Sequence, residues 1–379
     1  MCVSRRLPHR LTKGAHGDHY GMKSIEKYGF FVKRHGSDDH PSIPAPAYQQ
    51  WPALFAALPP WSAQEHRQWL TTTQARFWQA AGDQATLDTI AQAACALLGR
   101  SGKLREDLLA ALAFGIQAMA WHCYLRPWAE AREVATAVAT GEAVLAVAYS
   151  EPGGSPGVLH TTARHDGSTW LLTGSKQYIT NGPLADWFVV FARVAGDLPR
   201  REAFLVPAGA VQGAAMEVPA LLAGLPHGRL VLADVAVPGQ HRLPQEQALA
   251  AGRRLRRAED SLRLALLATA VRLIVRRGAS GEQHTAILGE ALLLEELAMA
   301  ALEALGSGRA QRQQALALAG LESAQVLGTY LQGLPSADDD HQMRLLQALP
   351  AALGRGDPQR LRAHLGRLAG SGEEPREGL

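Results

Sequence analysis

The stretch that decides the fold lies in the middle of the chain. It reads AVLAVAYSEPGGSP at residues 143–156, TWLLTGSKQYITNG at residues 169–182 and ADWFVVFAR at residues 185–193. Short runs rich in β-branched and aromatic residues alternate with Gly, Pro, Asn and Asp, a pattern typical of strands joined by tight turns. Such turns expose backbone N–H groups and hydroxyls beside an aromatic ring. This region is therefore suited to hold a planar, hydrogen-bonding ring system with a phosphate tail.

Further strands are expected on either side of these turns. The candidate strands cover residues 144–148, 169–173, 187–192, 204–206 and 230–232. Together they predict a compact antiparallel sheet or barrel domain over residues 141–243.

Helical periodicity flanks this sheet domain on both sides. Residues 42–140 predict an N-terminal helical domain, with Ser62 and Glu65 as a capping box at the start of one helix. Residues 244–370 predict four antiparallel helices, a C-terminal four-helix bundle, followed by a polar tail over residues 371–379. The expected fold class is therefore α+β, with helices, then a sheet, then a bundle.

Composition limits the class of protein. The chain has 379 residues, 47% hydrophobic, with a formal net charge of +3, so it can bury a large core and shows no sign of a nucleic-acid groove. The arginine run at residues 253–257 is interpreted as a solvated helix face. Three cysteines without CxxC spacing predict neither a disulfide framework nor a zinc site. The sequence has no run of 18 apolar residues, so we expect no membrane span. It also lacks the apolar region of a secretory signal, so we expect a cytoplasmic protein.

The first 41 residues differ from the rest of the chain. They are basic, rich in histidine and irregular, and the histidine spacing matches no metal-ligand pattern. We expect a disordered extension here, with Met22 as an alternative start.

Four landmarks carry a resemblance to a known family. They are SEPGGSP at residues 150–156, GSKQYITNG at residues 174–182, Ala185-Asp186, and DVAVP at residues 234–238. In this order they resemble the middle domain of the acyl-CoA dehydrogenase flavoproteins. The resemblance implies the three-domain layout of that family, with FAD bound against the sheet.

The resemblance also implies roles for particular residues. The flavin ring is expected to contact Val147, Ala148, Tyr149, Ser150, Tyr178, Ile179 and Thr180. The Ser150 hydroxyl would donate to a ring acceptor, and Tyr178 would stack on the ring, although ordinary sheet packing is the alternative for Tyr178. Ser155 matches a serine that touches the acyl-CoA. For Glu151 we expect a structural role, bonded to backbone and bracing the turn.

Several departures from the family pattern concern the chemistry. The turn is one residue shorter than usual, and Pro156 stands where Asp is common. The late Tyr-Glu-Gly-Thr segment that carries the usual catalytic glutamate is absent, since residues 353–358 read LGRGDP. Glu259, with Arg263 one turn later, is the candidate base, and a solvent-facing charge is the alternative. The pyrophosphate-binding Arg-x-x-Phe-Gly segment is also absent, and residues 276–278 are its nearest remnant.

Three functions are compatible with these features. The first is FAD-dependent α,β-desaturation of an acyl thioester carried by CoA or an acyl carrier protein, with electron-transfer flavoprotein or oxygen as acceptor. The resemblance further implies a homo-dimer or tetramer. The alternatives are a non-catalytic partner subunit of such an enzyme, and a flavin monooxygenase or nitroalkane oxidase on the same fold.

Overall fold

The computed structural model describes residues 62–153, 159–194, 200–215, 224–275 and 282–332, all within one compact unit, His40–Leu379. Several predictions lie outside the described residues. They concern the N-terminal extension, Ser155 and Pro156, residues 276–278, the fourth bundle helix and the C-terminal tail.

Helices precede the sheet, as predicted. They are α3 (Ala63–Ala81), α4 (Leu87–Cys95), α5 (Leu104–Ala120), the π-helical turn η2 (Trp121–Leu125) and α6 (Arg132–Ala139). The capping box at the start of α3 is confirmed, because the Glu65 N–H donates to Ser62 Oγ (3.2 Å) while the Ser62 N–H donates to the Glu65 carboxylate (3.1 Å). Cys95 and Cys123 are buried free thiols in these helices.

The sheet follows, with eight strands among the described residues. They are β1 (Leu145–Ala148), β2 (Thr162–Asp166), β3 (Thr169–Thr180), β4 (Trp187–Val194), β5 (Arg200–Pro207), β6 (Gln212–Ala215), β7 (His227–Pro238) and β8 (Arg242–Leu243). The order is β6-β7-β3-β2-β4-β5-β8, and β1 pairs with β4. The sheet domain is confirmed, but its pairing is mixed, since β4 pairs in parallel with both β1 and β2. The β2–β3 hairpin separates β1 from β4 along the chain, which leaves room for a parallel pairing.

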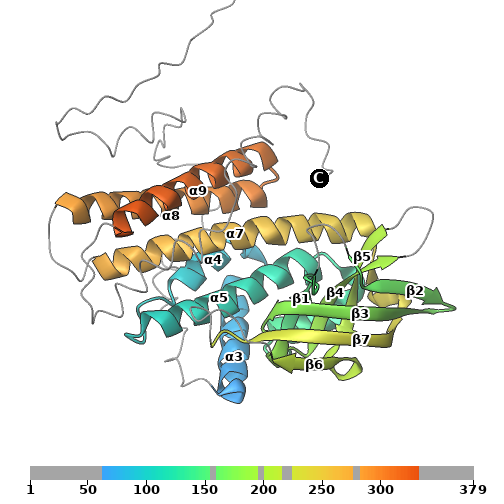
Figure 1. Ribbon diagram of the computed structural model, residues 1–379. Coiled ribbons are helices and arrows are strands. Elements are labelled where there is room, and N and C mark those ends of the chain that lie inside the picture. Colours follow the sequence, from blue (N-terminus) through green and yellow to red (C-terminus); the bar gives the residue numbers. More distant parts are fainter. Residues whose placement is uncertain (1–61, 154–158, 195–199, 216–223, 276–281, 333–379) are drawn as a thin grey trace, which may run out of the picture. The chain divides into compact units, whose positions relative to one another are not determined.

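Three helices follow the sheet in the described part of the chain. They are α7 (Gln245–Val275), α8 (Glu282–Gly306) and α9 (Ala310–Gln332). In Figure 1, α7 lies between α5 on one side and α8 and α9 on the other, while α4 packs against both α7 and α8. The beginning of α7 reaches the sheet, where it contacts β5.

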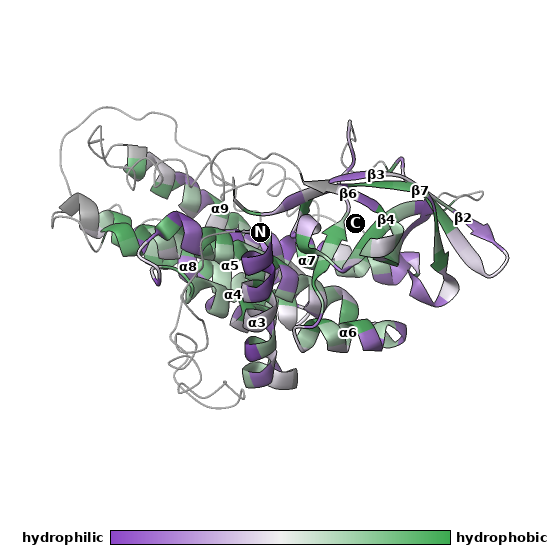
Figure 2. Cartoon of the chain, turned by 90° about the horizontal axis from the view of Figure 1, so that it is seen from below, coloured by the Kyte–Doolittle hydropathy of each residue, from purple (hydrophilic) through white to green (hydrophobic). Residues whose placement is uncertain are grey.

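Helices and sheet share one hydrophobic core. Phe77 of α3, Phe114 of α5, Val189 of β4 and Leu262 of α7 are all fully buried in it. Along β4, Val189 and Phe191 face this core, whereas the intervening Val190 packs into a second core between the strands. Successive side chains of a strand point to opposite faces, so β4 is buried on both sides and is hydrophobic for most of its length in Figure 2.

Two of the motif residues connect the sheet to the helices. Asn181, in the left-handed conformation (φ 61°), donates through Nδ2 to the Ala113 carbonyl of α5 at 2.9 Å. Asp186 accepts from Arg67 of α3 (2.5 Å) and from the Val144 N–H (2.8 Å). The end of β3 and the start of β1 are thereby held against α5 and α3.

One described helix, Leu104–Leu125, is long and apolar enough to cross a membrane by length and composition alone. Of its most apolar window, 83% is buried inside the structure. That degree of burial is typical of a core helix.

Candidate functional site

The turn after β1 is organised around the Glu151 carboxylate. Glu151 is buried and accepts backbone hydrogen bonds from the Thr161 N–H (3.0 Å) and from the His160 N–H. These bonds hold the turn to the segment that begins β2. The prediction that Glu151 braces the turn through backbone bonds is therefore confirmed.

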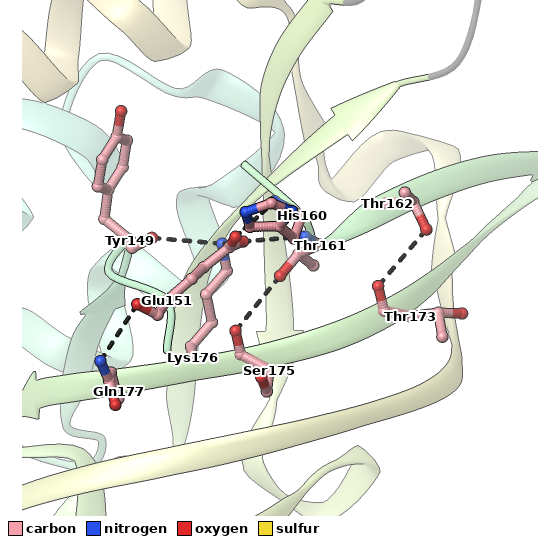
Figure 3. A network of polar contacts seen from close by, with 9 residues as sticks. All are labelled: Tyr149, Glu151, His160, Thr161, Thr162, Thr173, Ser175, Lys176 and Gln177. Atoms are coloured by element: carbon pink, nitrogen blue, oxygen red, sulfur yellow. Dashed lines mark hydrogen bonds and ion pairs between the residues drawn. The ribbon is translucent and has the colours of Figure 1, made fainter. Parts of the chain in front are cut away.

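Lys176 of β3 completes this network, and the sequence did not single it out. Its side chain is fully buried, with Nζ 2.6 Å from Glu151 Oε1 and 3.3 Å from the Tyr149 carbonyl oxygen. Figure 3 shows the ammonium between these two groups, while the Tyr149 ring points away from them. Burial lowers the pKa of Lys176 to about 8, against the opposing effect of Glu151. Burial raises the pKa of Glu151, but hydrogen bonds from Lys176, Thr161 and His160 outweigh it and lower this pKa to about 2.

Gln177 joins the same turn to β3 on its other side. Its backbone N–H donates to the Ser150 carbonyl (2.9 Å), and its side-chain Nε2 donates to the Glu151 carbonyl (3.1 Å). The end of β1 therefore lies beside the segment that leads into Tyr178. This brings together the two groups of residues predicted to contact a flavin, residues 147–150 and residues 178–180.

Tyr178 is exposed because β3 is irregular at this point. The pairing of β3 with β7 shifts register between Lys176 and Ile179, and Tyr178 has a φ of 55°. A non-glycine residue in this region of φ is uncommon and marks a constrained position. As a result, Ile179 is buried in the sheet core, while Tyr178 is 54% exposed.

The residues predicted to contact the flavin differ in which of their groups are accessible to a ligand. Val147 packs toward the shared core and Ala148 toward the core between the strands, so their side chains lie on opposite faces of β1. Ala148 and Ile179 are buried and could contribute only backbone groups. Ser150 and Tyr178 are exposed, and among the described residues neither side-chain hydroxyl has a hydrogen-bond partner. An unpaired hydroxyl and an exposed ring on adjoining segments fit the edge and face of a planar ring.

Thr180, at the end of β3, has a histidine partner. Its hydroxyl lies 3.3 Å from His227 Nε2, and His227 Nδ1 lies 3.0 Å from the Leu225 carbonyl. Burial lowers the pKa of His227, so the ring is neutral, with Nδ1–H donating to the carbonyl and Nε2 accepting from Thr180. The Thr180 oxygen remains free to accept a further hydrogen bond.

An aromatic cluster connects Tyr149 with α7. The Tyr149 ring packs edge-on against Phe191 at 4.9 Å, and Phe191 packs against Tyr124 of η2 at 6.0 Å. Gly252 of α7 fits closely against this cluster, because a Cβ there would lie 3.2 Å from the Tyr124 hydroxyl. Tyr124 stands in a π-helical turn, a feature that is frequent at functional sites.

Glu259 lies on α7 two turns after Gly252. Its side chain is 18% exposed and pairs with Arg263 at 3.1 Å, while Arg263 also pairs with Asp260 at 2.8 Å. Burial raises the pKa of Glu259 despite the attraction of Arg263. Burial also raises the pKa of Tyr124, and electrostatic effects of Cys123, Glu259 and Tyr149 add to this shift. The predicted base and a predicted flavin-contact residue therefore both act electrostatically on Tyr124.

The arginine run of α7 does not behave as one solvated face. Arg256 is exposed and pairs with Asp260 at 3.3 Å. Arg254, in contrast, is half-buried, and its Nε is buried without a hydrogen-bond partner among the described residues. The interpretation as a solvated face is thus right for Arg256 and wrong for Arg254, which lies next to η2 and perturbs the pKa of His122 there.

The sequence missed the residues that hold the site, although one signal was available. A lysine in the middle of a strand must be paired if it is buried, and Glu151 was already expected to be buried. Thr161, His227 and Tyr124 carried no such signal, because their roles depend on contacts between segments far apart in the chain.

The comparisons with known proteins agree with this architecture. Residues 146–235 match the family model of the acyl-CoA dehydrogenase middle domain. The chain is 45% identical over 73 residues to a probable acyl-CoA dehydrogenase of Bacillus subtilis (strain 168), covering 18% of this chain and 12% of that protein. It is 43% identical over 72 residues to the mitochondrial short-chain specific acyl-CoA dehydrogenase of Bos taurus, covering 18% of each. These alignments thus span less than a fifth of either relative.

Similarity to solved structures extends over most of the chain. Glutaryl-CoA dehydrogenase of Mycobacterium smegmatis, in complex with FADH2, superposes with a TM-score of 0.62 at 19% identity, covering 95% of this chain and 96% of that one. The nitroalkane oxidase of Podospora anserina superposes with a TM-score of 0.67 at 18% identity, covering 88% and 97%. At these identities the likeness establishes the fold.

Fold and middle domain together define the class: a helix–sheet–helix protein with an acyl-CoA dehydrogenase middle domain. Within the chain, residues 146–235 are the part that the family model matches to the acyl-CoA dehydrogenases.

Proposed function

We propose that this protein binds FAD against the face formed by residues 147–150 and 178–180. The observation that carries the proposal is the Gln177–Ser150 backbone bond, which holds Ser150 against the segment that leads directly into the exposed Tyr178. The complex of the structurally similar glutaryl-CoA dehydrogenase with FADH2 supports the choice of flavin. Ser150 would bond the ring edge, Tyr178 would stack on the ring, and Thr180 would accept from an N–H.

The reaction we propose is α,β-desaturation of an acyl thioester. FAD, when bound, supplies the acceptor for the hydride that leaves the β-carbon. Glu259 accepts the proton from the α-carbon, a role that its raised pKa favours because it makes the carboxylate a stronger base. Arg263 keeps the carboxylate oriented. The named acyl-CoA dehydrogenases among the relatives support an oxidoreductase acting on a CH–CH bond.

The partners follow from this reaction and from the family. The thioester would be carried by CoA or an acyl carrier protein, and electrons would pass to electron-transfer flavoprotein or to oxygen. We further propose a cytoplasmic homo-dimer or tetramer, with Ser155 contacting the thioester carrier.

The test is an absorption spectrum of the purified protein, with the released cofactor identified by chromatography. Flavin bands followed by their bleaching during anaerobic titration with acyl-CoAs of graded chain length would support both parts of the proposal. A colourless protein that also fails to take up added FAD would refute flavin binding and favour a non-catalytic partner subunit. Bound flavin that no thioester reduces would refute only the desaturation.

The similarity to a nitroalkane oxidase gives a second candidate function. An oxidase of that type would consume oxygen with a nitroalkane substrate and would leave acyl-CoAs unchanged. Oxygen-electrode measurements with nitroethane and with butyryl-CoA separate the two candidates.

A further inference from the structure

The buried pair of Glu151 and Lys176 is a densely hydrogen-bonded polar group that the proposed reaction does not use. Both side chains are at most 3% exposed and lie 2.6 Å apart. Burying two charges is costly unless additional hydrogen bonds satisfy them. Here the turn segment and β2 supply those bonds, through the Tyr149 carbonyl and the N–H groups of His160 and Thr161.

We propose that Lys176 is a positioning residue for the flavin-binding face, acting through the Tyr149–Ser150 peptide. This inference rests on the proposed binding of FAD. The link is the planarity of the peptide group, in which the carbonyl of one residue and the N–H of the next point in opposite directions. Because Lys176 draws the Tyr149 carbonyl toward the interior, the Ser150 N–H points outward.

The Ser150 N–H is available to donate a hydrogen bond at the flavin-binding face. It makes no hydrogen bond among the described residues, and a free backbone N–H on an exposed turn is a fixed donor for a ring acceptor. The Ser150 hydroxyl is carried on the same residue. Lys176 thereby orients two donors of Ser150, its N–H and its hydroxyl. The neighbouring Gln177 N–H holds the Ser150 carbonyl in place.

A second ion pair in the same sheet, with a buried glutamate and a partly buried arginine, offers a control. Glu202 of β5 is 1% exposed and bonds the Arg242 guanidinium of β8. The Arg242 guanidinium also lies over the Trp170 ring, 4.9 Å from its centre. No residue of this pair belongs to the proposed flavin face. Loss of this pair therefore measures what a partly buried ion pair of the same sheet contributes to folding alone.

The experiment measures FAD affinity and apoprotein unfolding for Lys176→Met, Glu151→Gln and the double variant. Lys176→Met alone leaves the Glu151 charge unpaired, so it lowers stability. The double variant removes both charges and recovers much of that stability. If Lys176 positions the Ser150 donors, FAD binding stays weaker by about tenfold in the double variant, which corresponds to about 1.4 kcal/mol. The flavin absorption band also changes shape, because the hydrogen bonds at the ring edge are altered.

The control variants Glu202→Gln with Arg242→Met should lower stability and leave FAD affinity and the flavin band unchanged. A Glu151/Lys176 double variant with the FAD affinity and flavin band of the wild type would overturn the proposal and leave the pair a purely structural role. Wild-type protein that binds no FAD would overturn the proposed function itself, and this inference with it. The two failures are thus distinguished by the wild-type measurement.

Discussion

Glu151 and Glu259 are both acidic residues paired with a basic side chain, yet their surroundings shift their pKa values in opposite directions. The turn after β1 gives Glu151 a lysine and two backbone N–H groups, and its pKa falls to about 2. On α7, Glu259 has Arg263 as its one hydrogen-bond partner among the described residues, and burial raises its pKa. For Glu151, hydrogen bonds to the carboxylate lower the pKa by more than burial raises it. For Glu259, the effect of burial is the larger one. A fully bonded carboxylate serves the structure, whereas an incompletely bonded one remains available to take a proton.

The largest expected effect is on the reaction itself. Glu259→Gln should slow flavin reduction by an acyl thioester by about 10²–10⁴-fold, the usual contribution of a general base. FAD should remain bound, because none of the proposed flavin contacts involves α7. Arg263 keeps Asp260 as a partner at 2.8 Å, so folding should be little changed. Stopped-flow absorbance at the flavin band measures the rate, and unaltered reduction would exclude Glu259 as the base.

The next effect concerns stability at the first site. Lys176→Met should lower the free energy of unfolding by about 3–5 kcal/mol, because it leaves a buried carboxylate without its cation. Denaturant unfolding of the apoprotein at pH 7 provides the value. A loss below about 1 kcal/mol, the level of an exposed pair, would show that water replaces the lysine.

Acid should act on the same carboxylate. The stability that Glu151 contributes is present above pH 4.5 and is lost as the pH falls toward about 2, the pKa in the folded protein. A shift of this size corresponds to about 3 kcal/mol. Comparing wild type with Glu151→Gln between pH 5 and pH 2 isolates the contribution, since the variant lacks this titration. Parallel stability curves for the two proteins would contradict the low pKa.

The smallest expected effect is on stability, at the exposed ion pair between Arg256 and Asp260 of α7. Arg256, whose side chain is 76% exposed, pairs with Asp260 one turn away. Arg256→Gln should change the free energy of unfolding by about 0.5 kcal/mol or less, and high salt should abolish the difference. Thermal unfolding at two salt concentrations is sufficient. A larger, salt-resistant loss would mean that the α7 charges are coupled as tightly as those around Glu151.

The sequence predicted the parts of this protein that depend on local patterns. The capping box at Ser62, the strands at residues 144–148 and 187–192 and the bracing role of Glu151 follow from short motifs, and the structure contains each of them. Strand β2 was missed because its sequence, TARHD, is polar and largely exposed. The Lys176 contacts, the exposure of Tyr178 and the packing of Tyr124 against Gly252 depend on pairing between distant segments. No local pattern encodes those pairings.

The two-sided burial of β4 has a consequence for how the molecule unfolds. Because Val189 and Val190 face different cores, β4 cannot separate from either core without exposing apolar surface. Amide protons of this strand should therefore exchange with solvent only through opening of the whole described unit. The helices and the sheet should melt in a single cooperative transition, so the surface proposed to bind FAD is expected to stay ordered up to the melting temperature.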